Sequence, residues 1–95
     1  MLEKNQLYKR VLDVFGINNQ LMVTVEECSE LIKECSKMYR QKGNIGHLSE
    51  EIADVLIMCE QLIKYYNLKP QVENMMQEKL KRLKHRLEGA ERKTC

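Results

Sequence analysis

The chain has 95 residues, a net charge of +2, one proline, four glycines and 32% charged side chains. A chain of this length forms one domain with a small core. Its many straight-chain residues lose little rotamer freedom in helices and predict an all-α protein. No window approaches the ~20 apolar residues that span a bilayer, and no signal peptide is recognisable, so we expect a soluble, cytoplasmic protein with no membrane partner.

Apolar residues recur at helical spacing in the first half of the chain. A first helix is expected at about 2–15, with Gly16 as a left-handed cap. After the asparagines of "INN", a second helix carries the clearest periodicity, with apolar steps of about four and three residues. Its apolar stripe consists of Leu21, Val25, Cys28, Ile32, Cys35 and Tyr39.

Two further helices are expected in the second half of the chain. The glycines of "QKGNIGH" break the second helix, and a third is expected at about 47–66. Pro70 ends that helix and suits the first turn of a fourth, at about 70–88. Residues 89–95 lack periodicity and are expected to fray, so that 1–95 forms one helical domain. The apolar stripe of the fourth helix is Val72, Met76, Leu80, Leu83 and Leu87.

The cysteines contain no CxxC pair, and three of them fall on the expected apolar faces. We expect them to be small core side chains in a reducing compartment. The four are Cys28, Cys35, Cys59 and Cys95.

Acidic residues gather in two motifs, "EECSE" on the second helix and "EIAD" on the third. Because each helical residue turns by about 100°, Glu27 and Glu30 project side by side, as do Glu51 and Asp54. If the two helices pack antiparallel through their apolar stripes, these four carboxylates converge. Their repulsion is on the order of 4 kcal/mol per pair at about 4 Å, far more than exposed lysines offset. A hard divalent cation, Mg²⁺ or Mn²⁺, would offset it.

Plainer interpretations remain open. Charges beside an apolar stripe also keep a helix soluble. A di-iron site is disfavoured, since neither His47 nor His85 stands three residues after a glutamate. At helical spacing, Tyr39, Tyr65 and Tyr66 are expected in the core, although they could stack on a base.

The acidic pattern resembles that of a known family. "EECSE", twenty intervening residues and "EIAD" are similar to the EExxE…ExxD signature of the MazG-like, all-α nucleoside triphosphate pyrophosphohydrolases. The similarity runs from about Gly16 to Arg86, through "GINNQL", "KMYRQKG" and "EKLKRLKHR". It implies a four-helix bundle assembled as a dimer or a dimer of dimers. It also implies Mg²⁺-dependent hydrolysis of a (deoxy)nucleoside triphosphate between the α and β phosphates, giving the monophosphate and pyrophosphate.

Individual roles follow from the same resemblance, position by position. It implies catalytic carboxylates that bind the metal at Glu27, Glu30, Glu51 and Asp54, and a further catalytic residue, Glu26, that orients a ligand or the attacking water. Leu83 stands where the family often has asparagine, a departure within the phosphate site. The implied substrate-binding residues are Lys37, Arg40, Lys79 and Arg86 at the phosphates and Gln20 near the base.

Charge is divided along the chain, and this division supports a different class of function. Residues 24–63 carry eight acidic and four basic side chains, whereas 64–95 carry four acidic and nine basic ones. A small helical nucleic-acid-binding or regulatory protein could use the basic fourth helix. Its basic residues lie on several faces, which makes nucleic acid the weaker alternative. A third possibility is an inactive structural dimer.

Overall fold

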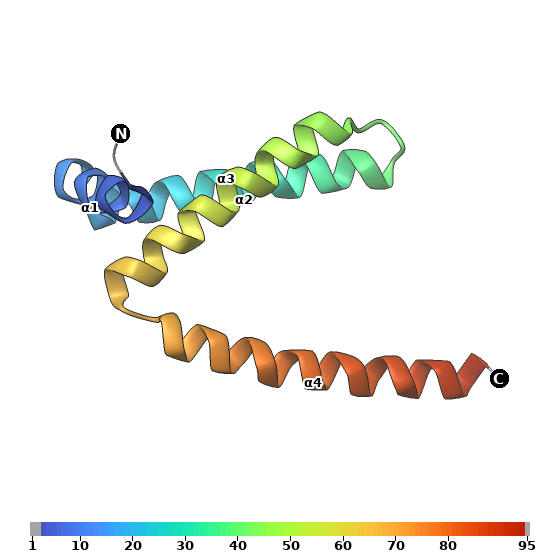
Figure 1. The fold of residues 1–95 in the computed structure, drawn as a ribbon. Helices are drawn as coiled ribbons and strands as arrows, with labels where there is room; N and C mark the ends of the chain where they lie inside the picture. Colours follow the sequence, from blue (N-terminus) through green and yellow to red (C-terminus); the bar gives the residue numbers. More distant parts are fainter. Residues whose placement is uncertain (1–2, 95) are drawn as a thin grey trace.

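A computed structural model describes residues 3–94, which form four α-helices and no strand (Figure 1). The all-α prediction is therefore confirmed for this part of the chain. The expected start of the first helix at residue 2 and the last residue of the tail, Cys95, lie outside the described residues. The helices are α1 (Lys4–Phe15), α2 (Ile17–Tyr39), α3 (Ile45–Tyr66) and α4 (Lys69–Thr94).

Gly16 joins α1 to α2 without an intervening loop. Its N–H donates to the carbonyl of Leu12 at 3.0 Å, and its own carbonyl accepts the N–H of Gln20 at 3.1 Å. The backbone has φ 83° and ψ 157°, a region that is essentially limited to glycine. The expected positive φ is present, but the left-handed helical cap is wrong, because ψ is extended and turns the chain directly into α2.

Helices α2 and α3 form an antiparallel pair with a heptad register. Gln20 on α2 donates from Nε2 to Oε1 of Gln61 on α3 at 2.7 Å. Seven residues later on α2 and seven earlier on α3, Glu27 faces Asp54. After another seven residues in the same directions, Glu34 Oε1 lies 3.9 Å from Nδ1 of His47. Three polar layers therefore cross this seam, each about 10 Å from the next at 1.5 Å per residue.

The seam uses a face of α2 next to the expected apolar stripe. That stripe is largely exposed, with Val25 59% and Ile32 69% accessible. The assumption that the two helices meet through their apolar stripes is therefore wrong. Because α1 and α3 cover only part of α2, its most apolar face has no neighbour within the described chain. The positions turned toward α3 are Gln20, Thr24, Glu27, Leu31, Glu34 and Met38.

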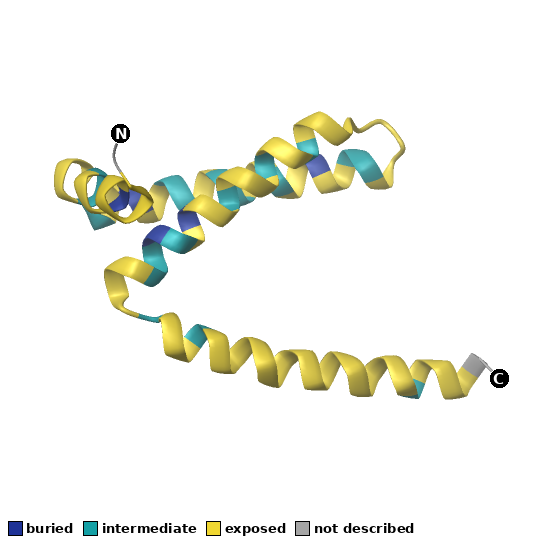
Figure 2. Cartoon of the chain, in the orientation of Figure 1, coloured by how far each residue is buried: buried dark blue, intermediate teal, exposed yellow. Residues whose placement is uncertain are grey.

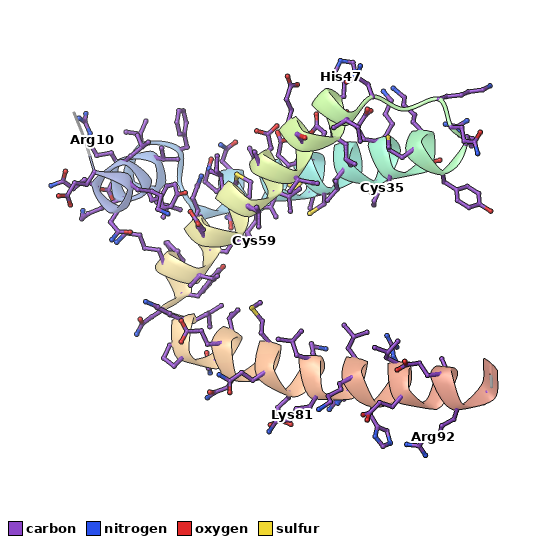
Figure 3. All side chains as sticks on the ribbon, turned by 45° about the vertical axis from the view of Figure 1, so that its right-hand side comes forward. Arg10, Cys35, His47, Cys59, Lys81 and Arg92 are labelled. Atoms are coloured by element: carbon purple, nitrogen blue, oxygen red, sulfur yellow. The ribbon has the colours of Figure 1, made fainter. Side chains whose placement is uncertain are left out.

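Several residues expected in the core are also exposed, on α2 and on α3. Cys28 is half-buried, whereas Cys35 and Cys59 are exposed, so the core assignment is wrong for these two (Figure 3). All three are free thiols. The tyrosines expected in the core are also exposed, Tyr39 by 90% and Tyr65 and Tyr66 by 47% each.

Helix α1 packs across the other end of the α2–α3 pair, away from the α2–α3 turn. Its anchor is Tyr8, which is 5% exposed and donates to Glu60 Oε1 at 2.5 Å. Burial, this hydrogen bond and the charge of Glu60 together raise the pKa of Tyr8 to about 12. The hydrogen bonds from Tyr8 and Lys4 lower the pKa of Glu60. The network fixes α1 against α3.

Helix α4 extends away from the rest of the molecule. Asn67 ends α3 with a left-handed backbone of φ 56°, and α4 then contacts only α3 among the described helices (Figure 1). It is exposed over nearly its whole length (Figure 2), and it continues through residues 89–94, where fraying was expected. The radius of gyration of 17.2 Å exceeds the about 12 Å of a compact domain of this length.

No helix within the described residues combines the length and the apolar character needed to cross a membrane. The charged and polar positions on every helix account for this.

Candidate metal centre

Three carboxylates from two helices converge in the middle of the α2–α3 seam. Glu27 on α2 and Glu51 and Asp54 on α3 each offer one oxygen, and these oxygens all lie within 4.8 Å of one another. Glu27 and Glu51 are half-buried, and Asp54 is exposed. The cluster is therefore built into the helix contact and stays open to solvent on one side.

The negative charges of this cluster are not neutralised. Burial first, then the charge and hydrogen bond of Asp54, and then Glu51 and Glu30, raise the pKa of Glu27. Burial and the charges of Asp54, Glu30 and Glu34 raise the pKa of Glu51. Among the described residues, no lysine or arginine forms an ion pair with these three side chains.

One oxygen of Glu51 has no partner inside the protein. Its Oε2 is buried and accepts no hydrogen bond from the described residues. A buried polar atom without a partner costs about 1–3 kcal/mol. Together with the neighbouring carboxylates, this oxygen suits a cation, and an all-oxygen donor set suits Mg²⁺ or Mn²⁺.

The structure brings three of the four expected ligands together. Glu30 lies close enough for its charge to raise the pKa of both Glu27 and Glu51, yet it is exposed and outside the 4.8 Å group. Glu26 is also exposed, and its carbonyl accepts the hydroxyl of Ser29 at 2.7 Å. Glu26 thus lies beside the cluster without belonging to it.

Two of the expected phosphate-binding residues lie toward the α2–α3 turn. Lys37 is held by Glu34, with Nζ 3.3 Å from Oε2. Arg40 is exposed at the end of α2, where its Nε donates to the carbonyl of Ser36 at 3.4 Å. Lys37 is the better placed of the two, because its anchor lies in the seam itself.

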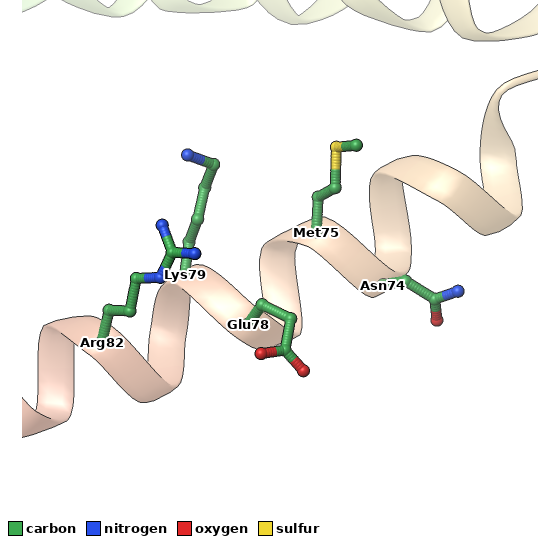
Figure 4. Close-up of a pocket in the computed structure, with 5 residues that line it drawn as sticks. All are labelled: Asn74, Met75, Glu78, Lys79 and Arg82. Carbon is green, nitrogen blue, oxygen red and sulfur yellow. The ribbon is translucent and has the colours of Figure 1, made fainter.

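The other two expected phosphate contacts are far from the carboxylates within this chain. Lys79 and Arg86 are exposed on α4, where they line a groove of about 320 Å³ with Arg82 and Leu83. A similar groove of about 330 Å³ lies nearby on the same helix (Figure 4). One helix forms the only wall of both grooves, so neither encloses a ligand. The groove in Figure 4 is lined by Asn74, Met75, Glu78, Lys79 and Arg82.

Gln20, the expected contact near the base, is buried inside the helix pair. Its Nε2 donates to Gln61, and its Oε1 accepts the side-chain N–H of Asn19 at 3.1 Å. Both ends of the amide are thus hydrogen-bonded within the protein, and the bond to Gln61 holds α2 against α3, one heptad from Glu27. No polar atom of this side chain is turned to the carboxylate cluster.

Sequence reasoning placed Glu34 among the acidic residues of the second helix but missed its pairing with His47, which forms the third polar layer of the seam. Gln20, Glu27 and Glu34 follow one another at heptad spacing on α2. This repeat of polar residues was the available signal, because a heptad position faces the same neighbouring helix each time.

Comparisons with protein-family models, with curated proteins and with solved structures find no match to this chain.

Proposed function

We propose that the chain is a MazG-like nucleotide pyrophosphohydrolase that requires Mg²⁺, with Mn²⁺ as a substitute. It hydrolyses a nucleoside or deoxynucleoside triphosphate between the α and β phosphates, giving the monophosphate and pyrophosphate. The observation that carries the proposal is the convergence of Glu27, Glu51 and Asp54 without a cationic partner. The EExxE…ExxD spacing supports the family assignment, and the three free thiols of the described chain suit a reducing cytoplasm.

Each carboxylate has a separate task in this proposal. Glu27, Glu51 and Asp54 would hold the cation, and Glu30 would be a fourth carboxylate ligand. Glu26 orients a ligand or the water molecule that attacks phosphorus. When bound, Mg²⁺ neutralises phosphate charge and polarises the phosphorus–oxygen bonds. No phosphate-binding glycine loop is then needed.

Self-association is the second part of the proposal. The chain exposes 8077 Å², whereas a compact protein of 11.3 kDa exposes about 5,700 Å². The excess of about 2,300 Å² per chain corresponds to an obligate homodimer interface, which buries roughly 2,000–5,000 Å² in total. A second copy, rather than another protein, fits this surface because both partners then cover equivalent apolar stripes.

A second copy would also complete the site. The stripe of α4 leaves Leu80 59% and Leu83 52% exposed, and covering it places α4 against another protomer. Lys79 and Arg86 can reach a carboxylate cluster only in this way, because α4 extends away from its own α2–α3 pair (Figure 1). The leucine at position 83, where the family often has asparagine, fits this arrangement because it extends the apolar stripe of α4 that a second copy would cover.

The test is release of pyrophosphate from a panel of canonical and modified triphosphates, with Mg²⁺ or Mn²⁺ present. We expect Glu30→Gln, Glu51→Gln and Asp54→Asn each to lower kcat by about 100-fold or more while helical circular dichroism is retained. Glu50→Gln is the matched control, because it removes a neighbouring exposed carboxylate outside the cluster. No turnover of any member of the panel, or full activity of the triple variant, would refute the proposal.

The exposed, basic α4 favours one alternative function, nucleic-acid binding. Phosphate contacts from lysine and arginine would make the affinity fall steeply with salt. A gel-shift experiment decides between the two. Salt-sensitive binding that survives loss of Glu51 and Asp54, together with absence of triphosphate turnover, would favour the alternative.

A further inference from the structure

The third polar layer of the seam holds a buried carboxylate beneath two basic side chains. Glu34 is 6% exposed, and its Oε2 lies 3.3 Å from Lys37 Nζ. Its Oε1 lies 3.9 Å from Nδ1 of His47 and accepts no hydrogen bond from the described residues. Lys37 comes from α2 and His47 from the first turn of α3, so one carboxylate lies beside basic groups from both helices.

This layer borders the carboxylate cluster. His47 precedes Glu51 by one helical turn, and Glu34 follows Glu30 by one turn. The negative charge of Glu34 is one of the lesser causes that raise the pKa of Glu51, after burial and the charges of Asp54 and Glu30. The layer lies at the end of the helix pair nearest the α2–α3 turn (Figure 3).

A ligand held at Glu27 and Asp54 can extend along the seam in one direction only. Toward α1 the next layer is the Gln20–Gln61 hydrogen bond, where both side chains are buried and 5% exposed. Toward the turn, the side chain of Lys37 is 35% exposed and that of His47 is 65% exposed. The open direction therefore carries two basic side chains, Lys37 and His47, beside the buried Glu34.

The chemistry of this layer suits an anion. The buried carboxylate pairs with the lysine and lies beside the imidazole, while the outer hydrogen-bond donors of both stay free for a ligand. A lysine ammonium and a histidine N–H form charge-assisted hydrogen bonds with phosphate oxygens. A purely structural ion pair would need Glu34 and Lys37 but would make no use of an exposed His47.

We propose that Lys37 and His47 bind the pyrophosphate end of the substrate, and that Glu34 is the residue that positions both. Lys37 was expected to contact phosphate, and the new elements are the His47 contact and the anchoring role of Glu34. The inference rests on the proposed function for the identity of the ligand, a polyphosphate held partly by a divalent cation.

Binding of inorganic pyrophosphate in the presence of Mg²⁺, measured by calorimetry on the full chain, tests the proposal without turnover. We expect His47→Ala and Lys37→Met each to weaken this binding by about tenfold, the effect of losing one charge-assisted hydrogen bond. The matched controls are His85→Ala on α4 and Lys33→Met on the exposed face of α2. They should stay within about twofold of the original protein.

Steady-state kinetics separate positioning from structural support. His47→Ala should raise KM by about tenfold with kcat nearly unchanged. Glu34→Gln should act through its two neighbours, so that it weakens pyrophosphate binding in the original protein but has no further effect in the Lys37→Met/His47→Ala background. An equal effect in both backgrounds would overturn the positioning role of Glu34.

The result for His47 is informative even if Glu34→Gln fails to fold, because His47 is mostly exposed. Pyrophosphate binding that depends on His47 supports the subsite even if no triphosphate is hydrolysed, in which case the proposed function alone fails. Turnover of triphosphates with unchanged KM and pyrophosphate affinity in His47→Ala and Lys37→Met overturns the subsite alone.

Discussion

Glu27 faces Asp54 across the α2–α3 seam, one heptad from the hydrogen bond that joins Gln20 to Gln61. The two pairs occupy the same heptad position at the contact between α2 and α3. One is a neutral, hydrogen-bonded amide pair, and the other is a pair of carboxylates. The amide pair satisfies itself, whereas the carboxylate pair adds repulsion that is relieved only by a proton or a cation. A carboxylate pair does not help α2 and α3 to pack together. This cost is the physical reason for proposing that the carboxylate pair has a function.

The first prediction concerns the pH dependence of stability without metal. The pKa values of Glu27 and Glu51 are raised above 4.5 in the folded state. The stability contributed by their protonation is fully present below pH 4.5 and is lost as pH rises through the raised values, because the folded state binds more protons there. Urea denaturation in EDTA at a series of pH values measures this.

The control for this measurement is Glu27→Gln/Glu51→Gln, which should lose less stability than the original protein across the same pH window. Millimolar Mg²⁺ should reduce the loss in the original protein, because a cation that binds only the folded state stabilises it. Parallel stability curves for the two proteins in EDTA would contradict the prediction.

The second prediction concerns the buried amide pair. Gln20→Ala leaves Oε1 of Gln61 without its donor and should lower the free energy of unfolding by about 1–3 kcal/mol. Gln20→Leu/Gln61→Leu removes both partners and should be nearly neutral. An equal loss in the single and double variants would be inconsistent with a hydrogen-bonded pair. A changed base preference in the folded double variant would support the substrate contact implied by the sequence resemblance.

The sequence was sufficient to predict four helices and the breaks between them. Glycines and Pro70 disrupt helical geometry locally, so these boundaries need no tertiary information. Helical spacing predicted which carboxylates share a face of each helix, because helical geometry gives each side chain a defined direction. Their convergence was expected from a packing of the apolar stripes that is wrong, and it includes Glu27, Glu51 and Asp54 but not Glu30. The breaks are local consequences of the backbone, whereas the convergence depends on how α2 packs against α3.

The sequence was not sufficient to predict which face of α2 meets α3. Periodicity ranks faces by apolar character and selects the stripe with Val25 and Ile32, yet that stripe is exposed. Hydrophobicity does not distinguish a face covered within the chain from one available to another molecule. The pairing of Tyr8 with Glu60, which lie 52 residues apart, was missed because it depends on how α1 crosses α3.

The third prediction concerns that pair. Tyr8→Phe keeps the ring and removes the hydroxyl, so it should lower the free energy of unfolding by about 1–2 kcal/mol. In the original protein the Tyr8 phenol has a pKa of about 12, and the stability it contributes below pH 10 should be lost as pH rises through that value. Ultraviolet titration should show one tyrosine ionising about two pH units late, and Tyr8→Phe should remove this step.

Tyr39→Phe serves as the comparison, because Tyr39 is 90% exposed. It should leave both the free energy of unfolding and the late ionisation step unchanged. If Tyr8→Phe is as stable as Tyr39→Phe, the hydrogen bond to Glu60 contributes nothing to the attachment of α1.

The fourth prediction concerns the exposed stripes. Sedimentation velocity at micromolar concentration should give at least twice the chain mass of 11.3 kDa. Leu80→Lys or Ile32→Lys buries a charge in the proposed interface and should shift the protein toward the monomer. Lys81→Gln, on the face of α4 away from this stripe, should leave the mass unchanged. A monomeric original protein would exclude the interface.

Binding of Mn²⁺ to the carboxylate cluster, followed by electron paramagnetic resonance of the free ion, is the most direct test of the central claim. We expect saturable binding in the original protein and in Glu50→Gln, and a loss of about tenfold or more in affinity in Glu27→Gln, Glu51→Gln and Asp54→Asn. Binding that is absent from the original protein, or that survives all three substitutions combined, would show that the converging carboxylates of the α2–α3 seam are not a metal centre.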